Sequence, residues 1–421
     1  IRRPPRSTQS RSSAASDVYK RQPLIYQSDA FYPQTAVALL ETSQMRKWQF
    51  ASLIYQPFQY NPVSGELRLV SAVDVRIVYD LGMEITAGLS DTFMDEQAAQ
   101  MLDNFDQASQ WYPPAEGSAV QSGTSNYVII TTNTIYNGAA TAINNFLSEK
   151  QARGLTTEVV TETQYGGLTG QAPNGTAQKI RKWLQNNYVS KSIQYVLLIG
   201  NPNPSGGDVP MLMCWPNADT GYESAPTDYY YADLTGNWDL NGNQKYCEYS
   251  ADMASGGVDL AAEVYVGRIP VYTSVSGWQT TLSSILNKTV NYEQATSIAW
   301  RKSALLPMSF SDSSTDGARL AEYMKSNYLN SRGFTSYTLY QQGSFNSAMN
   351  SSYASDAELR GGVTRSRWAA YDYGIVTWWA HGSVTGAHIG YGSYWDGVIL
   401  QSSDVTYLDD AHPAVVYMNS C

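Results

Sequence analysis

The stretch that decides the fold runs from residue 127 to residue 200. It begins with "YVIITT" (127–132) and ends with "YVLLIG" (195–200), two short apolar runs with the length and composition of buried strands. Between them lie the helical pattern "AATAINNFLSEKQARG" (139–154) with its glycine stop, the strand "TTEVV" (156–160) and the helix "TAQKIRKWLQNNY" (176–188). Strands that alternate with helices predict a parallel sheet with helices on its faces, which is an α/β fold.

The same alternation returns after residue 270. Helices are predicted over 274–294, 316–333 and about 365–371, and strands over 302–310, 335–340, 375–381 and 414–421. We therefore predict two α/β subdomains. Subdomain A covers residues 126–295, and subdomain B covers residues 296–421 and is incomplete at its C-terminal end.

A β-rich domain is predicted over residues 23–90. Alternating apolar residues at 67–69 and 73–79 predict strands, and "NPVSGE" (61–66) predicts the turn before them. Residues 91–125 lose this pattern and end in a stretch rich in Pro, Gly and Ser, which favours a linker. Residues 1–22 carry six of the 27 positive charges without periodicity, so we interpret them as non-native sequence, or alternatively as a disordered basic arm.

Composition excludes several classes of function. A net charge of −10 with no basic stripe beyond residue 22 argues against nucleic acid as a partner. No apolar run approaches the roughly 18 residues of a membrane helix. Abundant Tyr and Gly with only 15% charged residues is more typical of secreted proteins. The three cysteines lack metal-site spacing, and a Cys214–Cys247 disulfide would leave Cys421 as the unpaired thiol.

Two predicted strands of subdomain B each end in a reactive side chain. "IVTWWAHGS" (375–383) carries His381, and "VVYMNSC" (415–421) ends in Cys421, after runs that we expect to be buried. Functional groups of an open parallel sheet collect beyond the carboxyl ends of its strands. An imidazole beside a thiol stabilises the nucleophilic thiolate, and Gly382 would let a substrate carbonyl approach closely. The alternative is a buried structural cysteine and a structural histidine.

The insertion at residues 225–270 is the other unusual stretch. Oxygen-bearing side chains at alternate positions predict a loop that wraps Ca²⁺, with Asp233, Asn237, Asp239, Asn241 and Asn243 as ligands. The loop departs from an EF-hand, because Gln244 replaces the required glycine and Ser250 replaces the glutamate at position twelve. A turn rich in Asn, Gly and Asp would look similar. No cofactor is expected for catalysis.

Four segments in order carry a resemblance to a known family. They are "YQPFQYNPVSGELRLV" (55–70), "VYVGRIPVY" (264–272), "LNKTVNYE" (286–293), and "WAHGS" (379–383) followed by a strand that ends in Cys. This chain resembles the gingipain-like cysteine peptidases, family C25 of the caspase-like clan. The resemblance implies caspase-like parallel sheets with flanking helices in two subdomains, preceded by a β-rich domain similar to that family's propeptide.

The resemblance also implies an activity and roles for individual residues. The protein would be a secreted or cell-surface endopeptidase that acts on proteins or peptides, with its propeptide-like domain as a partner in cis. Cys421 would attack the scissile carbonyl, His381 would protonate the leaving amine, and the N–H groups of Gly382 and Cys421 would bind the oxyanion. Asp312 would contact His381, and Asp316 would select a basic side chain before the cleaved bond.

The sequence departs from the family in ways that bear on activity. The loop with Asp312 and Asp316 has a shorter spacing than in gingipains, and the family continues beyond its nucleophile, whereas nothing follows Cys421 here. We therefore expect a C-terminally truncated fragment that is inactive as given. One alternative is a non-peptidase secreted or surface protein that keeps the fold. A serine hydrolase is disfavoured because the chain has no GxSxG motif.

Overall fold

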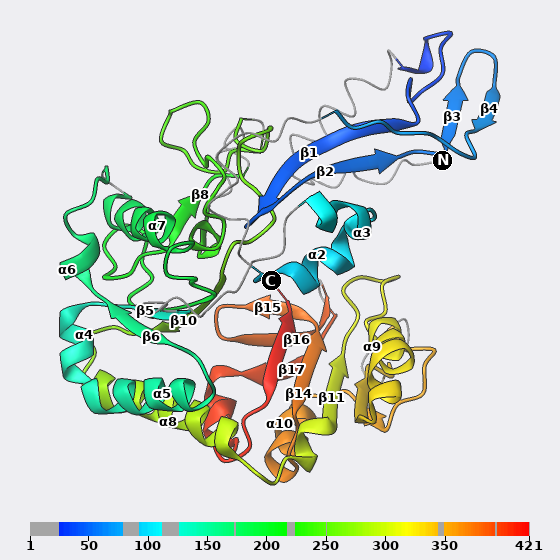
Figure 1. Ribbon diagram of the computed structural model, residues 1–421. Helices are drawn as coiled ribbons and strands as arrows, with labels where there is room; N and C mark the ends of the chain where they lie inside the picture. Colours follow the sequence, from blue (N-terminus) through cyan, green and yellow to red (C-terminus); the bar gives the residue numbers. More distant parts are fainter. Residues whose placement is uncertain are drawn as a thin grey trace. The chain divides into compact units, whose positions relative to one another are not determined.

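The chain divides into two compact units, residues 1–283 and 284–421. Figure 1 shows their helices and strands. The computed structural model describes residues 25–78, 92–111, 126–171, 174–216, 224–249, 251–343, 349–391 and 394–420. The predicted N-terminal segment 1–22 and most of the Pro/Gly/Ser-rich stretch lie outside the described residues.

The first unit begins with two antiparallel strand pairs, which confirms that the N-terminal region is β-rich. Strands β1 (Val37–Met45) and β2 (Trp48–Tyr55) form one pair, and β3 (Phe58–Asn61) and β4 (Glu66–Leu69) form the other. The predicted turn between β3 and β4 is present. Its geometry follows from the Asn61 side chain, which accepts hydrogen bonds from the N–H groups of Val63 and Ser64, and from Gly65, whose φ is +69°.

Two predictions for the region that follows need correction. The strand predicted at 73–79 is absent from residues 70–78, which pair with no strand among the described residues, and Tyr79 lies outside them. The alternating pattern alone could not supply a partner strand. Residues 91–125 were predicted as an irregular linker, but this stretch contains the helices α2 (Asp95–Met101) and α3 (Phe105–Ala108), whose Ala98 and Ala108 are buried.

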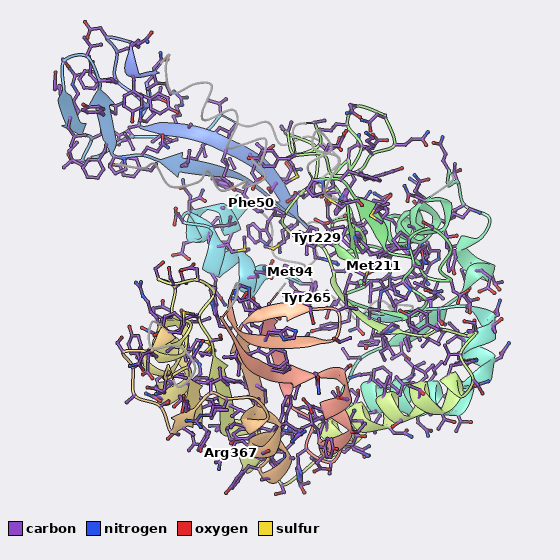
Figure 2. The ribbon with its side chains drawn as sticks, turned by 180° about the vertical axis from the view of Figure 1, so that it is seen from behind. Phe50, Met94, Met211, Tyr229, Tyr265 and Arg367 are labelled. Atoms are coloured by element: carbon purple, nitrogen blue, oxygen red, sulfur yellow. A yellow bond between two sulfur atoms is a disulfide. The ribbon has the colours of Figure 1, made fainter. Side chains whose placement is uncertain are left out.

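The turn that joins β1 and β2 is anchored on the α/β part of the same unit. Arg46 is 3% exposed, and its Nη1 donates to the backbone carbonyls of Ile193 and Glu263, at 2.9 Å each. Its guanidinium lies over the rings of Phe93 and Tyr188. Figure 2 shows Phe50, Met94 and Tyr265 gathered in this region. The propeptide-like hairpin is therefore packed against the amino ends of strands that belong to subdomain A.

Those strands form a parallel sheet in the order β10-β7-β5-β6. Their bounds are Tyr127–Ile130 for β5, Thr157–Val160 for β6, Tyr195–Gly200 for β7 and Tyr265–Pro270 for β10. The connections contain α4 (Asn133–Gly138), α5 (Ala140–Ala152), α6 (Glu162–Tyr165) and α7 (Gly175–Asn187). Val128 and Ile130 pack in one cluster with Ile180 and Leu184 of α7, whereas α5 covers the opposite face (Figure 1). The predicted alternation of strands and helices is confirmed.

The polar insertion between β7 and β10 is folded around the same core. It contains β8 (Leu212–Cys214), β9 (Ala225–Thr227) and a short 3₁₀ helix at Tyr229–Tyr231, and Tyr230, Tyr231 and Trp238 are buried. Cys214 and Cys247 form a disulfide, with a Cα–Cα distance of 5.3 Å, which is the pairing that the sequence analysis considered. The insertion is therefore a packed layer of the subdomain.

The second unit begins within helix α8 (Trp278–Gln294), whose first residues belong to the first unit. Its sheet has the order β13-β12-β11-β14-β18, and all of its pairs are parallel. The strands are β11 (Ser303–Met308), β12 (Thr335–Tyr340), β13 (Ala357–Glu358), β14 (Ile375–Trp379) and β18 (Val415–Asn419). Strands β15 (His381–Ser383), β16 (Gly386–Tyr391) and β17 (Tyr394–Gln401) form a separate antiparallel sheet.

Alternate residues of this sheet enter two cores. Leu305, Val376 and Trp378 pack in one cluster with residues of α10 (Val363–Ala370) and of the β15–β17 sheet. Leu306 and Met308 pack in a second cluster with Ala318 and Ala321 of α9 (Ala318–Met324). The period of two along each strand explains this division, because successive side chains point to opposite faces.

Strand β18 differs from the prediction that it is buried. Val415, Val416, Tyr417 and Met418 are 40–68% exposed. The reason is position: β18 is the last strand of its sheet and, within the described part of the chain, pairs only with β14. An apolar run indicates a strand, but its burial depends on neighbours that the run does not encode.

Candidate active site

Three parallel strands of the second unit end side by side. Trp379 at the end of β14 is in register with Met308 of β11 and with Asn419 of β18. The contact continues one residue further on each side, because Ser309 N–H donates to the Trp379 carbonyl at 2.8 Å and Ala380 N–H donates to the Asn419 carbonyl at 3.0 Å. His381 follows directly and is therefore held at this carboxyl edge, as predicted.

The imidazole of His381 is oriented by a backbone group. Its Nε2 lies 2.8 Å from the carbonyl oxygen of Ser311, in the loop that follows β11, and the ring is half-buried. A carbonyl oxygen only accepts hydrogen bonds, so this contact favours the tautomer with the proton on Nε2 and the lone pair on Nδ1. Nδ1 is then the nitrogen that can act as a base.

Hydrogen bonds between buried polar groups hold the loop that carries this carbonyl. The side-chain oxygen of Gln341, which is 2% exposed, accepts hydrogen bonds from Ser309 Oγ at 3.0 Å and from Phe310 N–H at 3.1 Å. Ser309 Oγ accepts in turn from Gly390 N–H at 3.0 Å, which joins the loop to β16. A satisfied buried network of this kind allows few alternative conformations.

Asp312 directly follows Ser311, and its side chain shapes the loop itself. Its carboxylate accepts hydrogen bonds from Ser314 N–H, Ser314 Oγ and Thr315 N–H, each at 2.8 Å. The hydrogen bond from Ser314 N–H contributes most to lowering the pKa of Asp312 to about 2. The carboxylate is therefore charged and closes the turn immediately after Ser311.

Asp316, the predicted specificity residue, lies at the start of α9. Its Oδ1 accepts from Ala318 N–H at 2.9 Å, and its Oδ2 accepts from Ser351 Oγ at 2.6 Å. It borders a hollow of about 270 Å³ whose walls are largely apolar and include Tyr323 and Trp379. Arg319 also lines this hollow, so both signs of charge are present at its rim.

Gly382 was predicted to help bind the oxyanion, and Cys421 was predicted to be the nucleophile. Gly382 lies in the middle of β15, opposite Ala387 of β16. Cys421 lies outside the described residues. The thiol–imidazole pair stays a prediction.

The five residues predicted to bind calcium lie in different local settings. Asp233 is fully buried, and its carboxylate accepts hydrogen bonds from Thr235 N–H, Gly236 N–H, Trp238 Nε1–H and Asp259 N–H. Those four donors already occupy both oxygens, so Asp233 fits a structural role better than a ligand role. The side-chain oxygens of Asn237, Asp239, Asn241 and Asn243 accept from backbone N–H groups within two to five residues and form consecutive turns.

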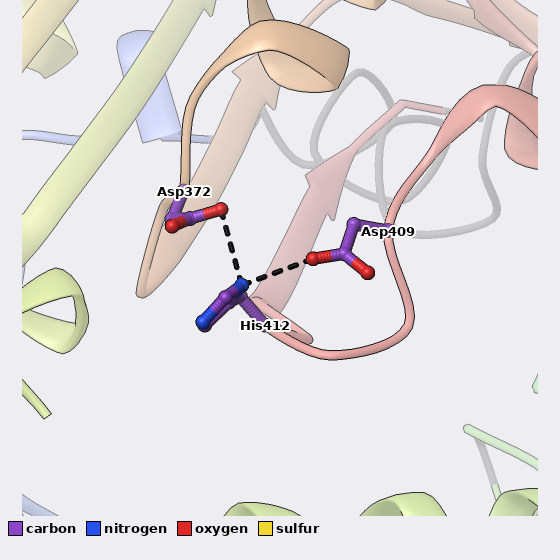
Figure 3. Close-up of side chains that lie close together, drawn as sticks. All are labelled: Asp372, Asp409 and His412. Atoms are coloured by element: carbon purple, nitrogen blue, oxygen red, sulfur yellow. Dashed lines mark hydrogen bonds and ion pairs between the residues drawn. The ribbon is translucent and has the colours of Figure 1, made fainter. Parts of the chain in front are cut away.

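Of the other two histidines, His388 is the cross-strand partner of His381 in the pairing of β15 with β16. His388 Nε2 lies 2.9 Å from Ser383 Oγ. His412 Nδ1 lies 3.0 Å from Asp409 and 3.2 Å from Asp372, as Figure 3 shows. This trio lies before β14 and β18, at the opposite ends of those strands from His381. The side chains of this trio are largely exposed. In the searched part of the chain, no other group of His, Cys, Asp or Glu side chains is close enough together to hold a metal ion.

Fold and site together define an α/β protein with a histidine at the carboxyl edge of a parallel sheet, preceded by a β-rich domain. The family model for "Peptidase family C25" matches residues 121–421, and the model for the propeptide of that family matches residues 8–111. The chain therefore belongs to peptidase family C25 and is a cysteine peptidase with its propeptide in the same chain. No curated protein and no solved structure matches it. None of the described helices is long and apolar enough to cross a membrane.

Sequence reasoning missed three groups that position the site. The Ser311 carbonyl is a backbone atom and has no signature in the sequence. Gln341 follows a strand, but nothing marks it as buried. Gly317 is required because a Cβ there would lie 2.6 Å from the Ser309 carbonyl oxygen and 2.7 Å from the Trp379 ring; its place after "SDSSTD" could have been noticed as a helix start.

Proposed function

We propose that the protein is a secreted endopeptidase in which Cys421 is the nucleophile and His381 is its base. The observation that carries the proposal is the register of β14 and β18. Trp379 is paired with Asn419, and residues 381 and 421 each lie two positions further along the chain. Adjacent strands are spaced about 4.8 Å apart, so a register that continued would bring imidazole and thiol within reach.

The hydrogen bond from His381 Nε2 supports the same assignment. With Nε2 held by the Ser311 carbonyl, Nδ1 would take the thiol proton and later deliver it to the leaving amine. Asp312 would act as a positioning residue, because its carboxylate fixes the turn that presents this carbonyl. The N–H groups of Gly382 and Cys421 would stabilise the oxyanion. Asp316 at the rim of the apolar hollow would favour a basic side chain before the cleaved bond.

The test uses the enzyme as it is secreted, with arginyl and lysyl peptide substrates. His381→Ala and Cys421→Ala should each lower kcat/KM by at least about a thousandfold, whereas His412→Gln, at the opposite ends of the strands, should leave it within about threefold. Alkylation by a peptidyl chloromethyl ketone should occur at Cys421, since Cys214 and Cys247 are joined in the disulfide. Activity that survives Cys421→Ala would favour the non-peptidase alternative or another nucleophile.

Secretion and calcium binding are proposed on separate observations. The Cys214–Cys247 disulfide supports an oxidising, extracellular location, because such bonds are rare in reducing compartments. We propose Ca²⁺ binding only for the exposed turns around Asp239, Asn241 and Asn243, whose oxygens keep lone pairs beyond their N–H partners. Added Ca²⁺ should raise the Tm of the protein, and Asp239→Asn should remove the increase; equal increases in both proteins would disprove this site.

A further inference from the structure

A second concave site lies in the same unit, away from His381. It is an open hollow of about 430 Å³ bordered by Tyr337 of β12, by the start of α10 and by Tyr371. Figure 2 marks Arg367, which projects from α10 beside it. Tyr371 precedes β14, whereas His381 follows that strand. At about 3.3 Å per residue, the five residues of β14 separate the two sites by roughly 16 Å.

The guanidinium of Arg367 is held in one orientation. Its central carbon lies 3.7 Å from the ring centre of Tyr337 and 3.5 Å from that of Tyr371. Its Nε donates to the hydroxyl of Tyr373 at 2.7 Å. Stacking and the Nε bond together leave only the edge with the two Nη groups open. Neither Nη group has a hydrogen-bond partner among the residues that the structure describes.

The charge in the hollow favours an anion. Arg365 also lines it and forms an ion pair with Asp404, whose Oδ1 lies 3.2 Å from its Nη1. No acidic side chain is among the lining residues, and Arg367 has no carboxylate partner in the described chain. Immobilising an arginine side chain on binding costs conformational entropy. The Arg367 side chain is already held in place, so ligand binding avoids much of this cost.

We propose that this hollow is an oxyanion-binding site in which the Nη edge of Arg367 binds two oxygens of a carboxylate or phosphate group. The planar fork of arginine matches both groups in bidentate geometry, which a lysine ammonium cannot reproduce. The site is separate from the proposed catalytic edge, so its ligand would bind without occupying the position of the scissile bond.

Calorimetric titration of the full chain tests the site, with inorganic phosphate in one arm and a blocked Glu-Glu dipeptide in the other. Sodium chloride at equal ionic strength is the reference. We expect saturable one-to-one binding of at least one probe. Arg367→Lys keeps the charge but loses the fork, so it should weaken binding by about tenfold or more. Arg332→Lys is the matched control, because Arg332 also lies over a tyrosine ring, that of Tyr328, outside the hollow.

A second variant distinguishes a direct effect on the hollow from a change in the fold. Ser366 lines the hollow and is exposed, so Ser366→Asp places a negative charge there without removing any contact of Arg367. It should also weaken binding by about tenfold or more. The arm that binds identifies the source of the oxyanion. The proposal is overturned if neither probe binds, if Arg367→Lys and Ser366→Asp bind like the unaltered chain, or if Arg332→Lys loses as much affinity as they do.

Discussion

Replacement of Arg46 should release the propeptide hairpin from subdomain A. Arg46 Nη1 donates to two buried carbonyls, and the guanidinium lies over two aromatic rings. A hydrogen bond to a charged group is worth about 1.5–3 kcal/mol, and a desolvated cation–π contact adds about 0.5–2 kcal/mol. Arg46→Ala should therefore weaken the docking of the hairpin by at least about 3 kcal/mol, which is more than a hundredfold in its opening equilibrium.

Hydrogen exchange of the full chain measures this opening. The amides of β1 and β2 near the turn should exchange at least about a hundredfold faster in Arg46→Ala, while those of β7 keep their protection. Arg46→Lys should give an intermediate rate, because an ammonium can reach both carbonyls but lacks the flat face that stacks on Phe93 and Tyr188.

Arg68 supplies the matched control within the same domain. It also lies over an aromatic ring, that of Phe31, and it pairs with Glu66, but its side chain is 54% exposed. Arg68→Ala should therefore change the exchange of the hairpin by less than about threefold. The reasoning is refuted if Arg46→Ala accelerates exchange no more than Arg68→Ala does.

Three further predictions concern stability. Burial raises the pKa of Glu263 to about 8 from 4.5, so the folded chain holds this proton more tightly than the unfolded chain. The free energy of unfolding should therefore fall as pH rises from about 4.5 to about 8. Urea titrations at several pH values should show that this free energy depends less on pH in Glu263→Gln. Gly317→Ala should cost about 1–3 kcal/mol in thermal unfolding, because its Cβ would lie 2.7 Å from the Trp379 ring; an unchanged Tm would contradict this. Replacing Cys214 and Cys247 together by Ser should cost about 3–4 kcal/mol in urea unfolding, as expected for a cross-link between residues 33 positions apart, and a loss below about 1 kcal/mol would argue against a structural disulfide.

Local sequence patterns predicted the helices and strands. Contacts between distant segments determined which strands are buried and which residues are partners, and local patterns do not encode these contacts. The run at 195–200 is buried on both faces of its sheet, so its composition alone identified β7. The run at 415–419 has a similar composition but lies at a sheet edge, where its side chains are exposed. Arg46 lies in a short turn between two strands, and nothing near it in the sequence indicates that its partners are 147 and 217 residues away.

The candidate base illustrates the same limit at the level of chemistry. A search for an acidic side chain near His381 leads to Asp312, whereas the contact at His381 Nε2 is the carbonyl of the preceding residue. Any residue at position 311 provides that carbonyl, so Ser311→Ala should preserve the orientation of the imidazole. Asp312 has a different constraint, because its carboxylate accepts three hydrogen bonds that close the turn. Selection on this site would therefore act on the conformation of the loop, through Asp312, Gly317 and Gln341, more than on the identity of the residue that touches the histidine.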